Sequence, residues 1–286
     1  MKKFLALLKK YPLLNMILTL VVCYLGLQLF DRACDNLAQC ALLRVILAVV
    51  CGASLFAISG SKSFEKLDKD IGYVQLKYIG FLIFAAAVGM VGFVPAIKNK
   101  VALVEKWPLE LFFCILLLVS VGIFEELCFR VLINDALLYQ FRNNKYIFVW
   151  IAIISSLVFG LVHVVGASIE TPVALTQAIL KTLTSALMGF GLLILYWKTH
   201  NFWAVAISHA IYDSLPLIVG QIFETGTAVG SGYISEETIV SDGFTFNKGY
   251  FLIGLYAIQL IIHLILVLGL LKVLKSIDFK KIREEW

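Results

Sequence analysis

The sequence predicts an all-α protein, a polytopic bundle of transmembrane helices with about eight spans and both termini in the cytoplasm. Two observations lead to this fold class. Of 286 residues, 61% are hydrophobic and only 15% are charged, with a mean hydropathy of +0.93, whereas about a quarter of a soluble domain is charged. The apolar residues also fall into runs of about 17 to 25, the length that crosses a bilayer as a helix.

Eight such runs follow one another without a repeat or a linker, so residues 1–286 are expected to form a single integral membrane domain. The first run follows four lysines, but it is too long for a signal peptide and lacks a cleavage site, which predicts a retained span. The fourth run exceeds what a bilayer needs, and its C-terminal end is expected to project into water. The expected spans lie near residues 12–30, 41–60, 74–95, 109–139, 147–167, 173–197, 202–221 and 249–272.

The basic residues set the expected orientation. With a cytoplasmic N-terminus, 16 of the 24 Lys and Arg residues fall in predicted inside segments and six in outside segments, while Arg130 and Lys181 lie within spans. The positive-inside rule therefore places both termini in the cytoplasm. The net charge of +5 does not indicate a nucleic-acid partner, because most of the basic residues lie in short loops and in the two tails. The longest connection, about residues 222–248, is polar and Gly-rich, and fits either a lid or a solvated loop.

The six cysteines show no CxxC spacing and so do not indicate a zinc framework. Cys34 and Cys40 share a predicted outer loop, where they could pair if that face is oxidising. The other four fall inside predicted spans and are interpreted as small buried hydrophobes. These four are Cys23, Cys51, Cys114 and Cys128.

The fourth span carries two carboxylates and a guanidinium, at Glu125, Glu126 and Arg130. A charge at the centre of a membrane helix costs roughly 2.5–3.5 kcal/mol on insertion scales. Glu126 and Arg130 are four residues apart, so they share a helix face and could form a structural ion pair. That pairing leaves Glu125 without a partner, which favours a functional site.

Two further spans contain ionisable groups at a comparable depth. His163 follows Phe159 by four residues, and His209 precedes Asp213 by four, so the members of each pair share a helix face. At 1.5 Å per residue, these groups and Glu125 lie about 12 to 24 Å above the inner ends of their helices. We therefore expect one common cavity that the polar faces line.

Three other polar residues have ordinary explanations. His263 is expected to be a hydrogen-bonded packing residue. Lys181 lies close enough to the outer end of its span either to snorkel to the interface or to join the site. Asp135 is expected in the projecting end of the fourth helix.

Carboxylates beside imidazoles in a protected cavity suit the activation of water. Peptide hydrolysis needs a base for the water, donors for the tetrahedral oxyanion and an acid for the leaving amine, and this set could supply all three. The sequence contains no Gly-x-Ser-x-Gly elbow, His-Glu-x-x-His helix or phosphate-binding loop. Ser120 and Ser208 lack a clear triad arrangement.

These residues resemble the three ordered motifs of the CPBP family of membrane proteases, which includes type II CAAX prenyl endopeptidases and bacteriocin-processing proteins. The resemblance spans about residues 107–221 and leaves the remaining spans as generic ones. The matching segments are Glu125-Glu126-x-x-x-Arg130, Phe159-x-x-x-His163 and His209-x-x-x-Asp213.

The resemblance implies a multi-pass cell-membrane endopeptidase whose site is accessible toward the cytoplasmic side. It implies that Glu125 and His163 activate the water and that His209 and Asp213 stabilise the oxyanion, with Glu126, Arg130 and Phe159 in support. A divalent metal such as zinc would be held by Glu125, His163, His209 and Asp213, and a metal-free mechanism is equally compatible. Relatives carry Asn or Asp at position 213. The implied substrate is a small peptide or a lipid-anchored protein, and the sequence does not determine the oligomeric state.

Two other classes of function remain open on the sequence. A non-catalytic scaffold or bacteriocin-immunity protein would bind a membrane partner, although the intact motifs count against it. A proton-coupled carrier would also place Glu and His within the membrane. The absence of obvious inverted repeats or paired broken helices ranks the carrier last.

Overall fold

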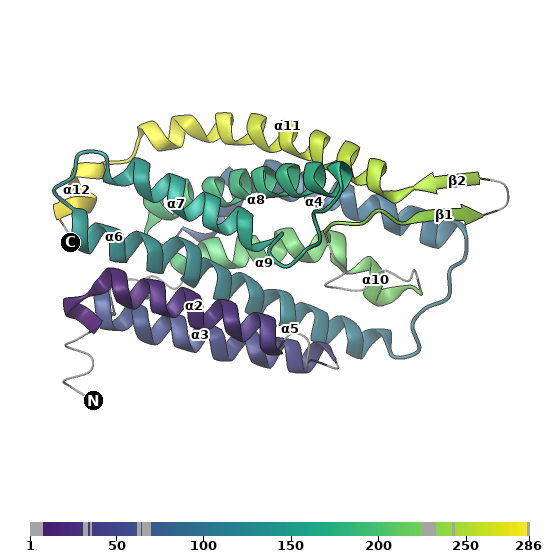
Figure 1. Cartoon of the computed structure of the whole chain (residues 1–286), viewed down its shortest axis with the longest axis horizontal. Coiled ribbons are helices and arrows are strands. Elements are labelled where there is room, and N and C mark those ends of the chain that lie inside the picture. The colour runs from purple at the N-terminus through teal and green to yellow at the C-terminus, as the bar shows by residue number, and fades with distance from the viewer. Residues whose placement is uncertain are drawn as a thin grey trace.

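The computed structural model describes residues 8–30, 34, 36–61, 64, 70–224, 233–241 and 244–284. Long helices run side by side along one common direction (Figure 1). The elements are α2 (Pro12–Phe30), α3 (Leu37–Ser59), α4 (Ile71–Lys98), α5 (Trp107–Glu125), η3 (Glu126–Leu132), α6 (Ile133–Phe141), α7 (Ile147–Val162), α8 (Pro172–Thr199), α9 (Phe202–Leu217), α10 (Val219–Ile222), β1 (Thr238–Ser241), β2 (Phe244–Asn247), α11 (Lys248–Lys275) and α12 (Phe279–Glu284).

The helical multi-pass membrane fold is confirmed, whereas the count of eight spans and the orientation of the termini stay predictions. Among the residues that the structure describes, five helical segments are long and apolar enough to cross a membrane: α3, α4, the continuous run Trp107–Phe141, α8 and α11. Two further apolar helices, α2 and α7, are shorter, and α9 has 16 residues. A helix needs about 20 residues to cross the hydrocarbon core, so length and composition support a multi-pass bundle but do not by themselves establish eight crossings.

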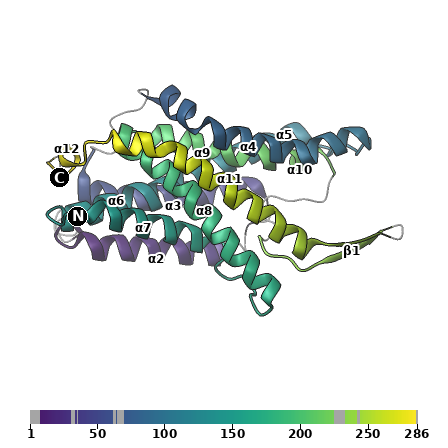
Figure 2. The same ribbon diagram turned by 90° about the horizontal axis from the view of Figure 1, so that it is seen from above.

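A small β-hairpin departs from the all-α expectation. β1 and β2 pair antiparallel, with Ile239 opposite Phe246 and Val240 opposite Thr245. β-Branched and aromatic residues favour strands, and both segments are rich in them. The hairpin lies at one end of the bundle, and both the start of α2 and the end of α12 lie at the opposite end (Figures 1 and 2).

The fourth expected span is one continuous helical run from Trp107 to Phe141. The helix continues beyond the length of a span as expected, and residues 139–141 at its end are exposed, but the expectation that Asp135 projects into water is wrong, because Asn134 and Asp135 are both 0% exposed. Trp197 of α8 donates a hydrogen bond from Nε1 to Asn134 Oδ1 at 2.8 Å, and Asn134 Nδ2 donates to Asp135 Oδ1 at 3.0 Å. Hydrogen bonds within the protein thus replace the water that these polar groups would otherwise need.

Small residues allow the helices of the core to approach one another closely. A Cβ atom at Gly160 of α7 would lie 2.3 Å from the Thr182 carbonyl oxygen of α8. At Gly122 of α5, a Cβ atom would lie 2.7 Å from the Ala206 carbonyl oxygen of α9. Small residues are common where membrane helices pack closely, and these two contacts fix α7 against α8 and α5 against α9.

Candidate active site

The first motif lies where the fourth span changes from an α-helix to a π-helix. Glu125 is the last residue of α5, and Glu126 is the first residue of η3, all seven residues of which are buried. A π-helix closes its hydrogen bonds five residues apart and is rare, and such turns occur frequently at functional sites. The wider turn shifts the phase of the helix just after Glu125, and two neighbouring carboxylates reach the same histidine.

His209 of α9 lies at the centre of the site. Its Nδ1 atom is 2.7 Å from Glu126 Oε1, and its Nε2 atom is 3.3 Å from Asp213 Oδ2 and 3.7 Å from Glu125 Oε2. Because an ionised carboxylate only accepts hydrogen bonds, the proton of this contact lies on Nδ1, which donates a hydrogen bond to Glu126. Glu126 therefore orients the imidazole ring, and Nε2 faces the other two carboxylates.

Arg130 braces the carboxylate that orients His209. Its Nε atom lies 3.2 Å from Glu126 Oε2, and both side chains are 0% exposed. The guanidinium carbon also lies 3.7 Å from the centre of the Phe159 ring, a cation–π arrangement. Gly189 of α8 lies directly against Arg130 and Phe159. A Cβ atom there would lie 2.6 Å from Arg130 Nη2 and 2.8 Å from Phe159 Cδ1, so the close contact requires glycine.

The second motif brings His163 to the same aromatic ring. His163 follows directly after α7, and its Nδ1 atom lies 2.7 Å from the Phe159 carbonyl oxygen. A carbonyl can only accept, so Nδ1 is the protonated nitrogen and Nε2 keeps its lone pair when the ring is neutral. The Phe159 ring lies between the two histidines, 4.7 Å from His163 and 5.8 Å from His209 between ring centres.

Accessibility divides the cluster into a sealed part and an accessible part. The side chains of Glu126 and Arg130 are fully buried, and that of His209 is 2% exposed. Glu125 and Asp213 retain 19% and 25% exposure. Glu125, Asp213 and the half-buried His163 are therefore the groups that a substrate can reach first, and Glu126 and Arg130 hold His209 so that its Nε2 atom faces Glu125 and Asp213.

Two residues that the motifs do not include cover this region. Lys181 of α8 places its Nζ atom 4.0 Å from the centre of the Tyr233 ring and interacts electrostatically with Asp213 and Glu125. The Tyr233 ring lies 5.7 Å from that of His163. Lys181 thus packs against an aromatic side chain of the protein. Tyr233 gave no sequence signal, because no pattern related it to a distant helix.

The long connection expected at about residues 222–248 lies partly outside the described residues, and its described segment around Tyr233 is anchored to the bundle. The buried Gln177 side chain donates from Nε2 to the Ser235 carbonyl oxygen at 2.9 Å and accepts from the Ser235 N–H at 2.9 Å. Tyr256 of α11 donates its hydroxyl to the Tyr233 carbonyl oxygen at 2.7 Å. A glutamine inside a predicted span was a sequence signal for this attachment.

His263 is hydrogen-bonded within the core, as expected for a packing residue. Its Nδ1 atom lies 3.2 Å from the Thr184 carbonyl oxygen, and its Nε2 atom lies 3.1 Å from the Tyr212 hydroxyl. Gln259 also donates to that hydroxyl at 3.2 Å. This network ties α11 to α9 directly beside Asp213.

The expected metal ligands are residue types that bind metals, but their ligand atoms do not lie close enough together to hold one ion. Both histidines direct Nδ1 to a carbonyl or a carboxylate, as metal-binding histidines do. In the described part of the chain, however, three cysteines form the only group of three or more such residues whose ligand atoms all lie within 4.8 Å of one another. Glu125, His163, His209 and Asp213 do not form such a group, so the arrangement is not that of a closed metal site.

The comparison with protein families matches residues 107–215 to type II CAAX prenyl endopeptidase Rce1-like. The match covers less than half of the chain and includes all three motifs. No curated protein and no solved structure matched the chain.

Proposed function

Through the core at residues 107–215 the chain belongs to the CPBP family, and from this premise we propose that it is an intramembrane endopeptidase. It would hydrolyse a peptide bond in a small peptide or a membrane-anchored protein, using a water molecule that Glu125 activates. The observation that supports this most strongly is the convergence on His209. Three carboxylates from two helices lie within 3.7 Å of its ring nitrogens.

Glu125 is the proposed general base, because it is an accessible carboxylate with no arginine or lysine in ion-pair contact within the described chain. In the proposed reaction it takes a proton from water as the water oxygen attacks the substrate's carbonyl carbon. The carbonyl electron pair moves onto oxygen to form the oxyanion. When the C–N bond breaks, Glu125 returns the proton to the leaving nitrogen, which restores the carboxylate.

His163 is the proposed partner of Glu125 in holding the water. With Nδ1 committed to the Phe159 carbonyl oxygen, a neutral ring presents Nε2 as an acceptor for the second water proton. The water would then be oriented by two acceptors, with its oxygen lone pair free for attack. Such orientation accounts for a large share of the rate in enzymes that position both reactants.

His209 and Asp213 are the proposed oxyanion group. When both nitrogens of the His209 ring are protonated, Nε2–H can donate a hydrogen bond to the oxyanion, while Nδ1–H keeps its hydrogen bond to Glu126. Asp213 Oδ2, at 3.3 Å, accepts from Nε2 in the absence of substrate. An ionised Asp cannot donate, so it orients His209, whereas a protonated Asp213 could donate to the oxyanion directly.

The membrane orientation remains part of the proposal. We place eight crossings in the bilayer with both termini cytoplasmic, on the basis of the basic residues at the termini and in alternate loops. The β1–β2 hairpin lies at the end of the bundle opposite the start of α2 and the end of α12 (Figure 1), and Tyr233, which contacts His163, precedes this hairpin in the chain. A substrate that enters past Tyr233 would therefore come from the outer face, and the cytoplasmic access that the resemblance implies would need a different path.

The test compares peptides that accumulate in cells expressing the intact protein, Glu125→Ala or Glu110→Ala. Glu110 lies in the first turn of the same helix α5 and serves as the matched control. We expect the Glu125→Ala cells to accumulate uncleaved substrate while the protein still inserts, and the Glu110→Ala cells to match the intact protein. Identical peptide profiles for all three proteins would refute an endopeptidase and favour a scaffold.

A further inference from the structure

Three cysteines that are far apart in the sequence meet inside the protein. Cys23 comes from α2, Cys51 from α3 and Cys128 from η3, and their sulfur atoms all lie within 4.8 Å of one another. The sulfurs of Cys23 and Cys51 are 3.4 Å apart. The three residues are 2%, 0% and 1% exposed. This is a compact, fully enclosed group of three thiols.

We propose that Cys23, Cys51 and Cys128 form a binding site for one soft, thiophilic metal ion, of which copper in its +1 state is the biological example. Thiolate sulfur binds metals such as zinc at about 2.3 Å, so three sulfurs around a trigonal ion lie roughly 4 Å apart. The 3.4 Å between the sulfurs of Cys23 and Cys51, with Cys128 Sγ within 4.8 Å of both, is compatible with this separation. On binding, the ion replaces the thiol protons, which leave to solvent, and forms one bond to each sulfur.

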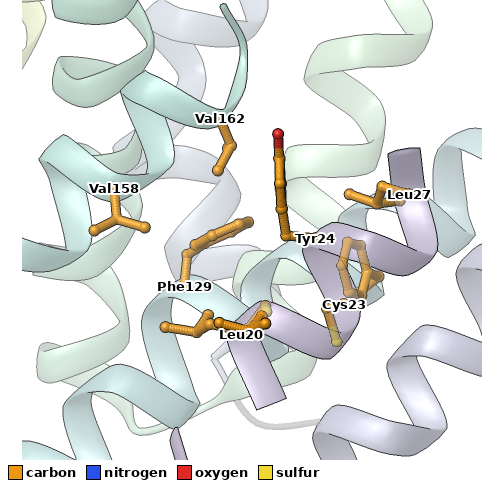
Figure 3. A pocket seen from close by; sticks show the side chains of 10 residues that line it. Leu20, Cys23, Tyr24, Leu27, Phe129, Val158 and Val162 are labelled. Carbon is orange, nitrogen blue, oxygen red and sulfur yellow. The ribbon is translucent and has the colours of Figure 1, made fainter. Parts of the chain in front are cut away.

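The surroundings of the site favour a soft ion over a hard one. A cavity of about 240 Å³ adjoins Cys23 and Cys128 and is lined by aliphatic and aromatic side chains, among them Leu20, Tyr24 and Phe129 (Figure 3). None of the described residues that line it is an Asp or a Glu, and hard cations such as Mg²⁺ require oxygen ligands. Sulfur ligands select soft ions such as Cu(I).

Cys114 shows that burial alone does not produce such a group. It lies on α5 and is 0% exposed, like Cys51, yet it does not belong to the three-thiol group. Small buried hydrophobes can occur singly anywhere in a core. Three of the four deeply buried cysteines nevertheless meet at the junction of three separate helical segments.

The position of Cys128 links this site to the catalytic helix. Cys128 lies in η3 between Glu126 and Arg130, and its neighbour Phe129 packs edge-to-face on Phe159 with 5.5 Å between ring centres. An ion bound to all three sulfurs would tie α2 and α3 to the π-helix that positions Glu126. Metal occupancy would thereby stabilise the arrangement of the candidate active site.

The test uses two complementary proteins purified in detergent with a reductant. The cluster-only protein carries Cys34→Ser, Cys40→Ser and Cys114→Ala and keeps the three-thiol group. The cluster-deficient protein carries Cys51→Ala and Cys128→Ala and keeps Cys114. Each is titrated with Cd²⁺, whose bonds to sulfur give an ultraviolet charge-transfer band, with Cu(I), and with Mg²⁺ as the hard-ion control.

We expect the cluster-only protein to bind one Cd²⁺ or one Cu(I) per chain, with a charge-transfer band for Cd²⁺ and no response to Mg²⁺. X-ray absorption of the Cu(I) form should show three sulfur neighbours. The cluster-deficient protein should lose the band. Failure of the cluster-only protein to bind either soft ion would overturn the proposal whether or not the other variant folds. Equal binding by both proteins would overturn it as well.

Discussion

Replacing Gly189 by alanine should displace Arg130 and Phe159 and thereby the active site, without changing any of its polar groups. The added Cβ atom would lie 2.6 Å from Arg130 Nη2 and 2.8 Å from Phe159 Cδ1. Both neighbours are buried, with Arg130 at 0% and Phe159 at 1% exposure. One or both must therefore move by roughly an ångström, and the motion reaches His209 through Glu126.

The expected magnitude follows from two opposing contributions. Adding a methyl group to a well-packed core costs about 1–3 kcal/mol, whereas Gly to Ala within a helix gains up to about 1 kcal/mol. The control Gly254→Ala, on α11, has the same helix gain and no atom within 4 Å of the new Cβ. The difference in free energy of unfolding between the two variants should therefore be about 1–3 kcal/mol, because the helix contribution cancels.

The assay measures unfolding of both variants in mild detergent and cleavage of the peptide that the Glu125→Ala comparison identifies. A displacement of about 1 Å near the reacting groups can reduce the rate by about 10²-fold. We expect this loss for Gly189→Ala and none for Gly254→Ala. If the two variants were equally stable and equally active, the stack of Arg130 on Phe159 would not position the site.

Three further predictions concern the polar groups and the orientation. Glu126→Gln leaves the buried Arg130 without a counter-charge and should lower the free energy of unfolding by about 3–5 kcal/mol. Glu125→Gln should abolish cleavage with little effect on the free energy of unfolding. The reverse pattern would exchange the roles of the two glutamates. Asp213→Asn should retain partial activity, since an amide can still accept from His209 or donate to the oxyanion, and loss of both turnover and metal binding would instead indicate a metal ligand. In a Tyr233→Cys variant whose partly exposed cysteines Cys34 and Cys40 are replaced by serine, the new thiol should react with a membrane-impermeant thiol reagent in intact cells. Reaction only after lysis would place position 233 on the cytoplasmic side.

Sequence patterns anticipated much of the helical arrangement, because membrane spans are encoded locally. Each expected span has a helical counterpart, from α2 at 12–30 to α11 at 248–275. The expectation for Asp135 was wrong because local composition does not report what packs against a residue. Asp135 was expected in the part of the helix that projects into water, but it is buried beside Asn134, whose hydrogen-bond donor Trp197 lies 63 positions away.

The candidate site was anticipated in its members and not in its geometry. A charged residue in a span is costly wherever it lies, so Glu125, His209 and Asp213 stood out from the chain alone. No spacing rule revealed that the fourth span becomes a π-helix at Glu126, or that Tyr233 lies beside His163. Contacts of that kind join residues that are separated by many positions.

The sequence by itself determined a multi-pass helical membrane protein and the three motifs by which it resembles the CPBP family, because hydrophobic length and the cost of buried charge are properties of single segments. Only the tertiary structure decided that two glutamates hold one histidine, and that Cys23, Cys51 and Cys128 meet in one cluster. The reason is that these features depend on how helices pack against one another, and helix packing is specified by the whole core at once.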